Sequence, residues 1–198
     1  MEKVTVCYRE QGGASSRELL RMAASRFTGL GEDQFATVPL PLPTDGDADA
    51  GEGKRYRKPV FLMHPELYAS VSHSGGVWAC ALTYGGPVGL DVQILTYPGR
   101  LEGIVRRFFH PEEAEAVLSV PVGDRAAAFT RMWCRKEAAV KQSGRGIDGQ
   151  FARFSAVPSP ADVLGQELYF TDFDLPGFPE IFCCAAYGNP FGILTERL

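Results

Sequence analysis

The segment 124–142 constrains the fold more than any other part of the chain. Its apolar residues recur at helical spacing and predict one buried face: Phe129, Met132, Trp133 and Val140. Two turns along that face from Phe129, the same stripe falls on Lys136 and Glu137. An unpaired buried charge is costly, so this helix must pack where its charged side chains find polar partners. Gly144 and Gly146 predict its end.

The rest of the chain alternates between predicted strands and helices. Alternating or continuous apolar residues predict strands over residues 4–8, 77–84, 88–95, 167–170 and 181–187. Helical spacing predicts helices over residues 16–27 and 101–108 and from residue 111 onward. Gly85-Gly86 predicts a hairpin between the second and third strands, and residues 39–58 read as a long loop. This order of elements indicates an α+β fold.

Three polar segments could carry chemistry. They are residues 70–76 (Ser-Val-Ser-His-Ser-Gly-Gly), 88–93 (Val-Gly-Leu-Asp-Val-Gln) and 133–141 (Trp-Cys-Arg-Lys-Glu-Ala-Ala-Val-Lys). Magnesium prefers oxygen ligands and usually takes one or two carboxylates, which Asp91 and Glu137 could provide. Lys141, one helical turn beyond Glu137, could hold a phosphate. His73, between two hydroxyls, could bind further phosphate oxygens.

Each segment alone also fits a purely structural role. Glu137 and Lys141 have the spacing of an ordinary ion pair along a helix. Asp91 could be an exposed strand carboxylate, and residues 72–74 could form a turn whose side chains bond to the backbone. The presence of all three segments in one order favours a shared function.

In that order the segments resemble the Sfp-type 4'-phosphopantetheinyl transferase family. The family pattern is Ser-His-Ser-Gly, then Gly-(Ile/Val)-Asp-x-Glu on a strand, then Trp-x-x-Lys-Glu-(Ala/Ser)-x-x-Lys on a helix, closed by Gly-(Lys/Arg)-Gly. The chain matches it at residues 72–75, 89–91, 133–141 and 144–146, and residues 107–109 resemble the family's Arg-Phe-Phe. The resemblance covers residues 15–150.

The resemblance implies roles for individual residues. It implies three catalytic residues, Asp91, Glu137 and Lys141, with Glu137 also deprotonating an incoming serine. It implies magnesium ligands at Asp91 and Glu137, and Gln93 stands where the family often has a second acidic residue. It implies contacts to coenzyme A from Arg17, Lys58, Ser72, His73 and Lys141. The match at Lys58 is looser because Arg57 replaces the family's glycine.

The resemblance also implies an architecture and a reaction. The fold would be two pseudo-symmetric α+β halves, 1–97 and 98–198, each a small antiparallel sheet packed with a long helix. Coenzyme A would lie between them. The reaction would be magnesium-dependent transfer of 4'-phosphopantetheine from coenzyme A to a serine of an apo acyl or peptidyl carrier protein, releasing 3',5'-ADP. A pseudo-dimer of this kind is expected to act as a monomer.

Composition excludes some other classes. A formal net charge of −4 argues against a general nucleic-acid binder. No run of apolar residues is long enough for a membrane span, and the first residues lack a signal-peptide stretch, so we expect a cytoplasmic protein. The five cysteines are odd in number and form no Cys-x-x-Cys pair, which argues against a disulfide framework or a zinc site.

Three other interpretations compete with the transferase. The small trimeric holo-acyl-carrier-protein synthases share the aspartate and the helix motif but are much shorter than 198 residues. A non-catalytic module that binds coenzyme A or a carrier protein would be consistent with Gln93 and with the short N-terminal region. A serine hydrolase using Ser72 or Ser74 would be expected to have a Gly-x-Ser-x-Gly elbow, which is missing.

Overall fold

The computed structural model describes residues 1–39, 58–144 and 151–198. The helices are α1 (Ser16–Thr28), α2 (Leu101–Phe108), α3 (Pro111–Leu118) and α4 (Arg125–Ser143). The strands are β1 (Glu2–Glu10), β2 (Thr37–Pro39), β3 (Pro59–Phe61), β4 (Tyr68–Ser74), β5 (Val77–Thr83), β6 (Val88–Ile94), β7 (Ala161–Val163), β8 (Gln166–Phe173), β9 (Ile181–Tyr187) and β10 (Phe191–Arg197).

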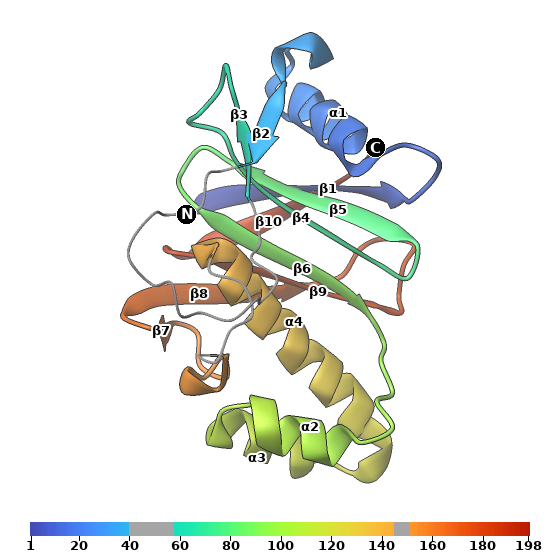
Figure 1. The fold of residues 1–198 in the computed structure, drawn as a ribbon, viewed down its shortest axis with the longest axis vertical. Coiled ribbons are helices and arrows are strands. Elements are labelled where there is room, and N and C mark those ends of the chain that lie inside the picture. The colour runs from blue at the N-terminus through green and yellow to red at the C-terminus, as the bar shows by residue number, and fades with distance from the viewer. Residues whose placement is uncertain (40–57, 145–150) are drawn as a thin grey trace.

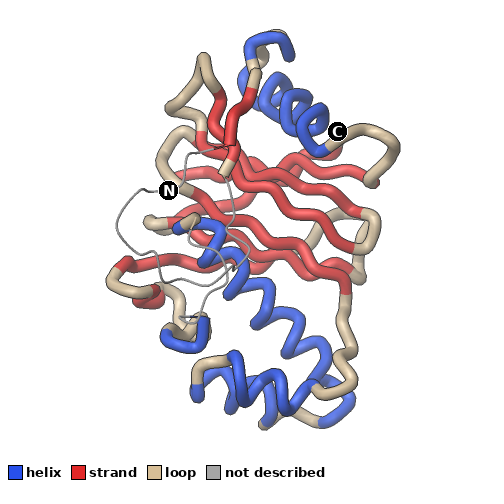
Figure 2. Tube along the Cα trace, in the orientation of Figure 1, coloured by secondary structure: helices blue, strands red, loops and turns tan. Residues whose placement is uncertain are grey.

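The strands form two sheets that pack between helices (Figures 1 and 2). One sheet has six strands in the order β10-β1-β5-β4-β3-β2, and only the β1–β10 pair is parallel. The other has four antiparallel strands in the order β6-β9-β8-β7. One apolar cluster lies between α1 and the six-stranded sheet, a second between the two sheets, and a third between the four-stranded sheet and α4.

The predicted α+β class is confirmed, since two mainly antiparallel sheets pack with several helices. The two sheets each draw strands from both parts of the sequence: β6 pairs with β9, and β10 pairs with β1. The division at residue 97 and the pseudo-symmetry stay predictions. The long loop predicted at residues 39–58 falls almost entirely outside the described residues, as does Gly146 at the end of the helix motif.

The hairpin predicted across Gly85-Gly86 is wrong, although both of its strands exist. β5 lies between β1 and β4, so both of its edges are occupied, and every one of its residues is buried. β6 instead pairs with β9 in the other sheet. The chain therefore crosses from one sheet to the other at the two glycines, which local turn chemistry cannot distinguish from a hairpin turn.

The predicted helix ends are confirmed where the structure describes them. Ser15 and Glu18 form a complete capping box at the start of α1. Gly144 ends α4 in the left-handed conformation, with a φ of 74°, and its N–H donates to the carbonyl of Val140 at 2.9 Å. Within residues 1–39, 58–144 and 151–198, no helix is long and apolar enough to cross a membrane.

Candidate active site

The site begins where α4 rests directly on β6. A Cβ atom added at Gly89 would lie 1.8 Å from the carbonyl oxygen of Ala138 and 2.6 Å from the backbone nitrogen of Gln142. Only glycine allows this approach of helix to strand. Asp91 is two residues further along β6 and shares the face of Gly89, so its side chain is directed toward α4. Cys134 of α4 also donates its thiol hydrogen to the carbonyl oxygen of Asp91 at 3.2 Å.

Asp91 is an almost fully buried carboxylate with two unequal oxygens. Its Oδ1 accepts from Lys141 Nζ at 2.7 Å and from Ser72 Oγ at 2.8 Å. Its Oδ2 is buried and, among the described residues, has no hydrogen-bond partner. A buried oxygen without a donor is rare in folded proteins, and such an oxygen is often a ligand of a bound ion. The unpaired Oδ2 therefore marks a place where a cation would fit.

Glu137 lies one turn before Lys141 on the same side of α4 and is only 6% exposed. The helix thus presents a carboxylate and an ammonium side by side, and the ammonium reaches Asp91 on the neighbouring strand. The sequence predicted that these three side chains would act together, and the fold brings Asp91 and Lys141 into direct contact. Two carboxylates, one of them with an unpaired buried oxygen, are a donor set suited to magnesium.

Three alternate serines of β4 hold β6 in place. The hydroxyls of Ser70, Ser72 and Ser74 accept from the backbone nitrogens of Leu90, Val92 and Ile94 at 3.0, 3.2 and 3.0 Å, respectively. These N–H groups point away from β9, so the serines take the place of a missing neighbouring strand. We call this set, from Ser70 to Ser74, the serine ladder. The segment is a strand, and its turn comes after it, at Gly75 and Gly76, both at positive φ.

The serine ladder was missed by the sequence reasoning, which considered residues 72–74 only as a phosphate contact or a turn. The signal was present: serines at i, i+2 and i+4 share one face of a strand. In β4 that face turns toward β6, and the intervening His73 turns toward the other face. Small hydroxyls on one face of a strand are therefore a sign that another backbone lies close by.

The charge of Lys136, predicted to need a partner, finds one in α3. Lys136 Nζ lies 2.8 Å from Glu113 Oε2, and both side chains are completely buried. The ammonium also donates to the carbonyl of Phe154 and lies 4.0 Å from the centre of the Phe154 ring. Burial lowers the pKa of Lys136, while Glu113 favours its charged form. This pair anchors the back of α4, away from Asp91.

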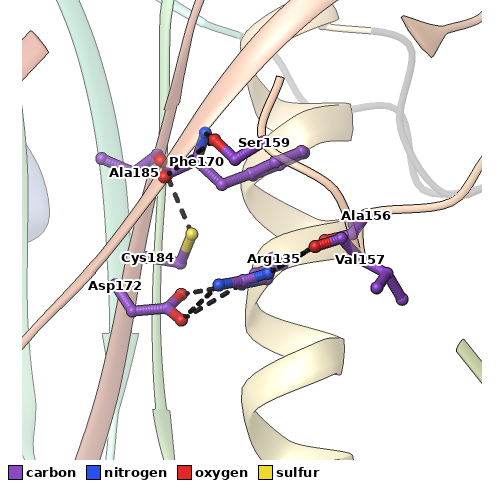
Figure 3. Close-up of polar contacts among 8 residues, drawn as sticks. All are labelled: Arg135, Ala156, Val157, Ser159, Phe170, Asp172, Cys184 and Ala185. Atoms are coloured by element: carbon purple, nitrogen blue, oxygen red, sulfur yellow. Dashed lines mark hydrogen bonds and ion pairs between the residues drawn. The ribbon is translucent and has the colours of Figure 1, made fainter. Parts of the chain in front are cut away.

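A second anchor holds the flank of α4 that faces β8 (Figure 3). Arg135 donates to both carboxylate oxygens of Asp172 at 2.7 to 3.1 Å, and to the carbonyls of Ala156 and Val157. Near this flank lies a cavity of about 520 Å³, lined in part by Arg131, Cys134 and Phe182. None of the predicted site residues lines it. Together the two anchors restrain the rotation of α4 and help to keep Lys141 directed toward Asp91 on β6.

The remaining predicted residues are spread around this centre. His73 is exposed and pairs across the sheet with Trp78, whose indole N–H donates to Ser16 at 2.9 Å. Arg17 follows Ser16 on α1 and is also exposed. Gln93 is half-buried, two residues beyond Asp91, and donates from Nε2 to Thr96 at 3.3 Å.

Lys58 links the two elements that carry the site. Its ammonium donates to the carbonyl of Gln142 at the end of α4 and, at 3.5 Å, to the carbonyl of Val88 at the start of β6. Burial lowers the pKa of Lys58 to about 8. Arg57, its neighbour in the looser family match, lies outside the described residues.

Among residues 1–39, 58–144 and 151–198, no three histidine, cysteine, aspartate or glutamate side chains converge as a metal cluster. A transition-metal site of that kind is therefore not found there. A magnesium site needs fewer protein ligands, because substrate phosphate and water usually complete the coordination shell. Asp91 and Glu137 stay the predicted carboxylate ligands of such a site.

Comparison with known proteins finds one family. Residues 87–176 match the model of the 4'-phosphopantetheinyl transferase superfamily. The chain is 37% identical over 81 residues to the 4'-phosphopantetheinyl transferase HetI of Nostoc sp. (strain PCC 7120), covering 41% of this chain and 34% of HetI. It is 35% identical over 99 residues to psf-1 of Bacillus pumilus (50% and 41% covered). It is 32% identical over 102 residues to Sfp of Bacillus subtilis (strain 168), covering 52% and 44%.

These matches confirm the resemblance to the Sfp-type transferases that the three motifs predicted. The chain matches less than half the length of each of these three relatives. The stretch that matches the superfamily model includes Asp91, Gln93, Glu137 and Lys141, whereas Arg17, Lys58 and His73 precede it.

Proposed function

We propose that this chain transfers the 4'-phosphopantetheine group of coenzyme A to a serine of an apo acyl or peptidyl carrier protein, releasing 3',5'-ADP. One observation carries the proposal: a buried Asp91 on β6 meets Lys141 of α4 through Oδ1, while Oδ2 has no hydrogen-bond partner among the described residues. This is an arrangement suited to a divalent cation beside a phosphate-binding ammonium. It lies within the stretch that matches the superfamily.

Asp91 and Glu137 would hold magnesium, with Gln93 as a further candidate oxygen ligand. When bound, the ion would offset negative charge on the pyrophosphate of coenzyme A. Asp91 is suited to this because its second oxygen is buried and free of protein donors among the described residues. Glu137 is suited because it is only 6% exposed, so bulk water does not compete with a cation for its carboxylate oxygens.

Glu137 would accept the proton of the attacking serine, directly or through a water molecule. The serine oxygen then bonds to the pantetheine-side phosphorus, and the bond from that phosphorus to the oxygen of the 3',5'-ADP breaks. Lys141 would stabilise the departing phosphate. Its ammonium already lies inside the site, 2.7 Å from Asp91, so little further desolvation is needed when a phosphate arrives.

His73, Arg17 and Lys58 would bind the nucleotide end of coenzyme A. The side chains of His73 and Arg17 are both exposed, and the salt bridges of the described residues include neither of them, so both could donate hydrogen bonds to phosphate. Lys58 donates only to carbonyl oxygens in the described contacts, so a phosphate would be a better partner for its charge.

We propose that the protein works as a monomer in the cytoplasm.

Incubation with coenzyme A, magnesium and a panel of apo carrier proteins tests the proposal, with intact mass as the readout. We expect one phosphopantetheine group to be added per carrier, and no addition when a chelator removes magnesium. Binding of coenzyme A with no mass gain on any carrier would instead support the alternative function, a non-catalytic binding module. Gln93, which lacks the charge of the family's acidic residue, is the observation that favours that alternative.

A further inference from the structure

We infer that Ser72 is a positioning residue that orients the Asp91 carboxylate and leaves Oδ2 toward the cation position. This inference rests on the proposed function, because it concerns the same metal site. It gives Ser72 a role different from the contact to coenzyme A that the family resemblance implies. Ser72 belongs to β4, and its side chain, only 6% exposed, contacts both β6 and α4.

The hydrogen-bond directions around Ser72 are fixed by chemistry. The backbone N–H of Val92 and the ammonium of Lys141 can only donate, and both reach Ser72 Oγ, at 3.2 and 2.8 Å. A serine hydroxyl has two acceptor lone pairs and one hydrogen, so these two donors use its acceptor capacity. The remaining hydrogen must therefore go to Asp91 Oδ1, 2.8 Å away.

This geometry determines which Asp91 oxygen stays available. Oδ1 receives two donors, Ser72 and Lys141, and both donors are themselves held, one by β4 and the other by α4. A carboxylate fixed at one oxygen by two converging donors cannot rotate freely. Without the hydroxyl, Lys141 would be the remaining hydrogen-bond donor to this carboxylate among the described residues, and the ammonium could bind either oxygen or both. Such second-layer partners typically change metal affinity when they are removed.

The serine ladder supplies an internal control. Ser70 is buried to the same degree, at 4% exposed, and accepts from the backbone nitrogen of Leu90 at 3.0 Å, as Ser72 does from that of Val92. No contact from Ser70 to Asp91 or Lys141 appears among the hydrogen bonds of the described residues. Loss of the Ser70 hydroxyl removes one rung that holds β6, and loss of the Ser72 hydroxyl removes a rung together with the Asp91 contact.

The test compares Ser72→Ala, Ser72→Thr and Ser70→Ala with wild type. Manganese binding is followed by electron paramagnetic resonance with coenzyme A present and no carrier protein, after subtraction of the signal from coenzyme A alone. Thermal unfolding of each variant reports the structural loss separately. We expect Ser72→Ala to bind manganese at least about tenfold more weakly, as outer-shell losses commonly do. Ser72→Thr keeps the hydroxyl and should bind close to wild type, as should Ser70→Ala.

Two results would overturn the inference while the proposed function stands: equal manganese affinity in Ser72→Ala and wild type, or an equal loss in Ser70→Ala. Equal losses would mean that the ladder acts only by holding β6. Absence of manganese binding by wild type itself would remove the metal site, and with it both the inference and the magnesium-dependent mechanism. The transfer assay on apo carriers then separates a failed metal site from a failed function.

Discussion

Lys141 Nζ of α4 lies 2.7 Å from Asp91 Oδ1 of β6, and the two side chains are only 10% and 6% exposed. The contact joins the two elements on which the proposed chemistry depends. In the absence of a bound cation, the ammonium is the positive charge that offsets the Asp91 carboxylate. The pair therefore stabilises the site and also occupies the carboxylate that would hold magnesium, so removal of Lys141 should have separable effects on stability and on metal binding.

Lys141→Met should lower stability and increase stabilisation by magnesium. Removing one partner of a buried ion pair leaves an uncompensated charge, at a cost of about 3–5 kcal/mol. Magnesium bound at Asp91 would restore the missing positive charge, so the rise in melting temperature on adding magnesium should exceed that of wild type. Lys136→Met is the matched control, because it leaves the buried Glu113 unpaired on the other side of the same helix. An equal magnesium effect in both variants would contradict this account of Lys141.

Glu137→Gln should nearly abolish transfer while leaving the fold intact. The amide keeps the shape of the side chain but loses both its charge and its capacity to accept a proton. A tenfold loss of rate corresponds to only about 1.4 kcal/mol of activation free energy. Because Glu137→Gln removes two roles, we expect the loss to be larger than that. The transfer rate and the melting temperature are both measured, with Glu115→Gln, an exposed carboxylate of α3, as control. A variant that keeps most of its activity would show that Glu137 is not catalytic.

Gly89→Ala should destabilise the protein and disrupt the site together. The new methyl group would lie 1.8 Å from the Ala138 carbonyl, so α4 must move away from β6. Forced repacking of this kind typically costs about 1–3 kcal/mol, and backbone contact places it at the upper end. Gly103→Ala in α2 meets nothing within 4 Å and should be neutral or stabilising. Chemical denaturation of both variants measures the difference, and equal stability would contradict the close helix–strand packing.

The sequence was most informative where a pattern was local. The periodicity of residues 124–142 predicted α4, and the charges on its apolar face predicted buried partners, which Lys136 found in Glu113. Both features follow from the spacing of residue types within one element, which is fixed by the geometry of the helix. The three motifs also predicted that Asp91, Glu137 and Lys141 act together: Asp91 and Lys141 are in contact, and the shared role of the three stays a prediction.

Pairing between distant strands could not be read in the same way. Nothing local in β5 and β6 indicates that the two glycines between them cross from one sheet to the other, or that β10 lies beside β1. The pairing of β6 with β9 and that of β10 with β1 both depend on which strand edges are unpaired when the sheets assemble. The serine ladder has the same origin, because a hydroxyl becomes the partner of an N–H only once β4 and β6 are adjacent.

Binding of coenzyme A should weaken as pH rises through 8 if Lys58 contacts a phosphate. Burial lowers the Lys58 pKa from 10.5 to about 8, so the ammonium charge falls between about pH 7 and 9. Lys58→Arg keeps its charge across this range and should bind with little pH dependence, which calorimetry at pH 7 and 9 can measure. A pH profile unchanged in Lys58→Arg would mean that Lys58 does not hold the phosphate.

The same pKa gives a stability prediction with a definite sign. Between pH 8 and 10.5 the unfolded chain retains a proton on Lys58 that the folded protein has released. The unfolded state then binds more protons, so the Lys58 contribution to the free energy of unfolding rises with pH across this window and is least favourable below pH 8. Lys58→Met removes the titrating group, so its stability should rise less over this range than that of wild type.

Gln93→Glu should lower the magnesium concentration needed for half-maximal transfer. Gln93 lies two residues beyond Asp91 on the same face of β6 and is half-buried. Its amide nitrogen donates to Thr96 at 3.3 Å, so its oxygen is the atom left to face a metal ligand shell. Replacing the amide by a carboxylate of nearly equal size adds a negative charge, which attracts a divalent cation more strongly.

The comparison needs a control for added charge alone. Gln166→Glu places the same change on an exposed position of β8, two strands away from β6 in the same sheet, and should leave the magnesium titration unchanged from that of wild type. The maximal rate of Gln93→Glu can move in either direction, because tighter metal binding can also retain the product, so the midpoint of the titration is the deciding quantity. Superimposable curves for wild type and Gln93→Glu would place Gln93 beyond reach of the metal. Asp91 and Glu137 would then be the protein ligands, with water and the coenzyme A phosphates completing the shell.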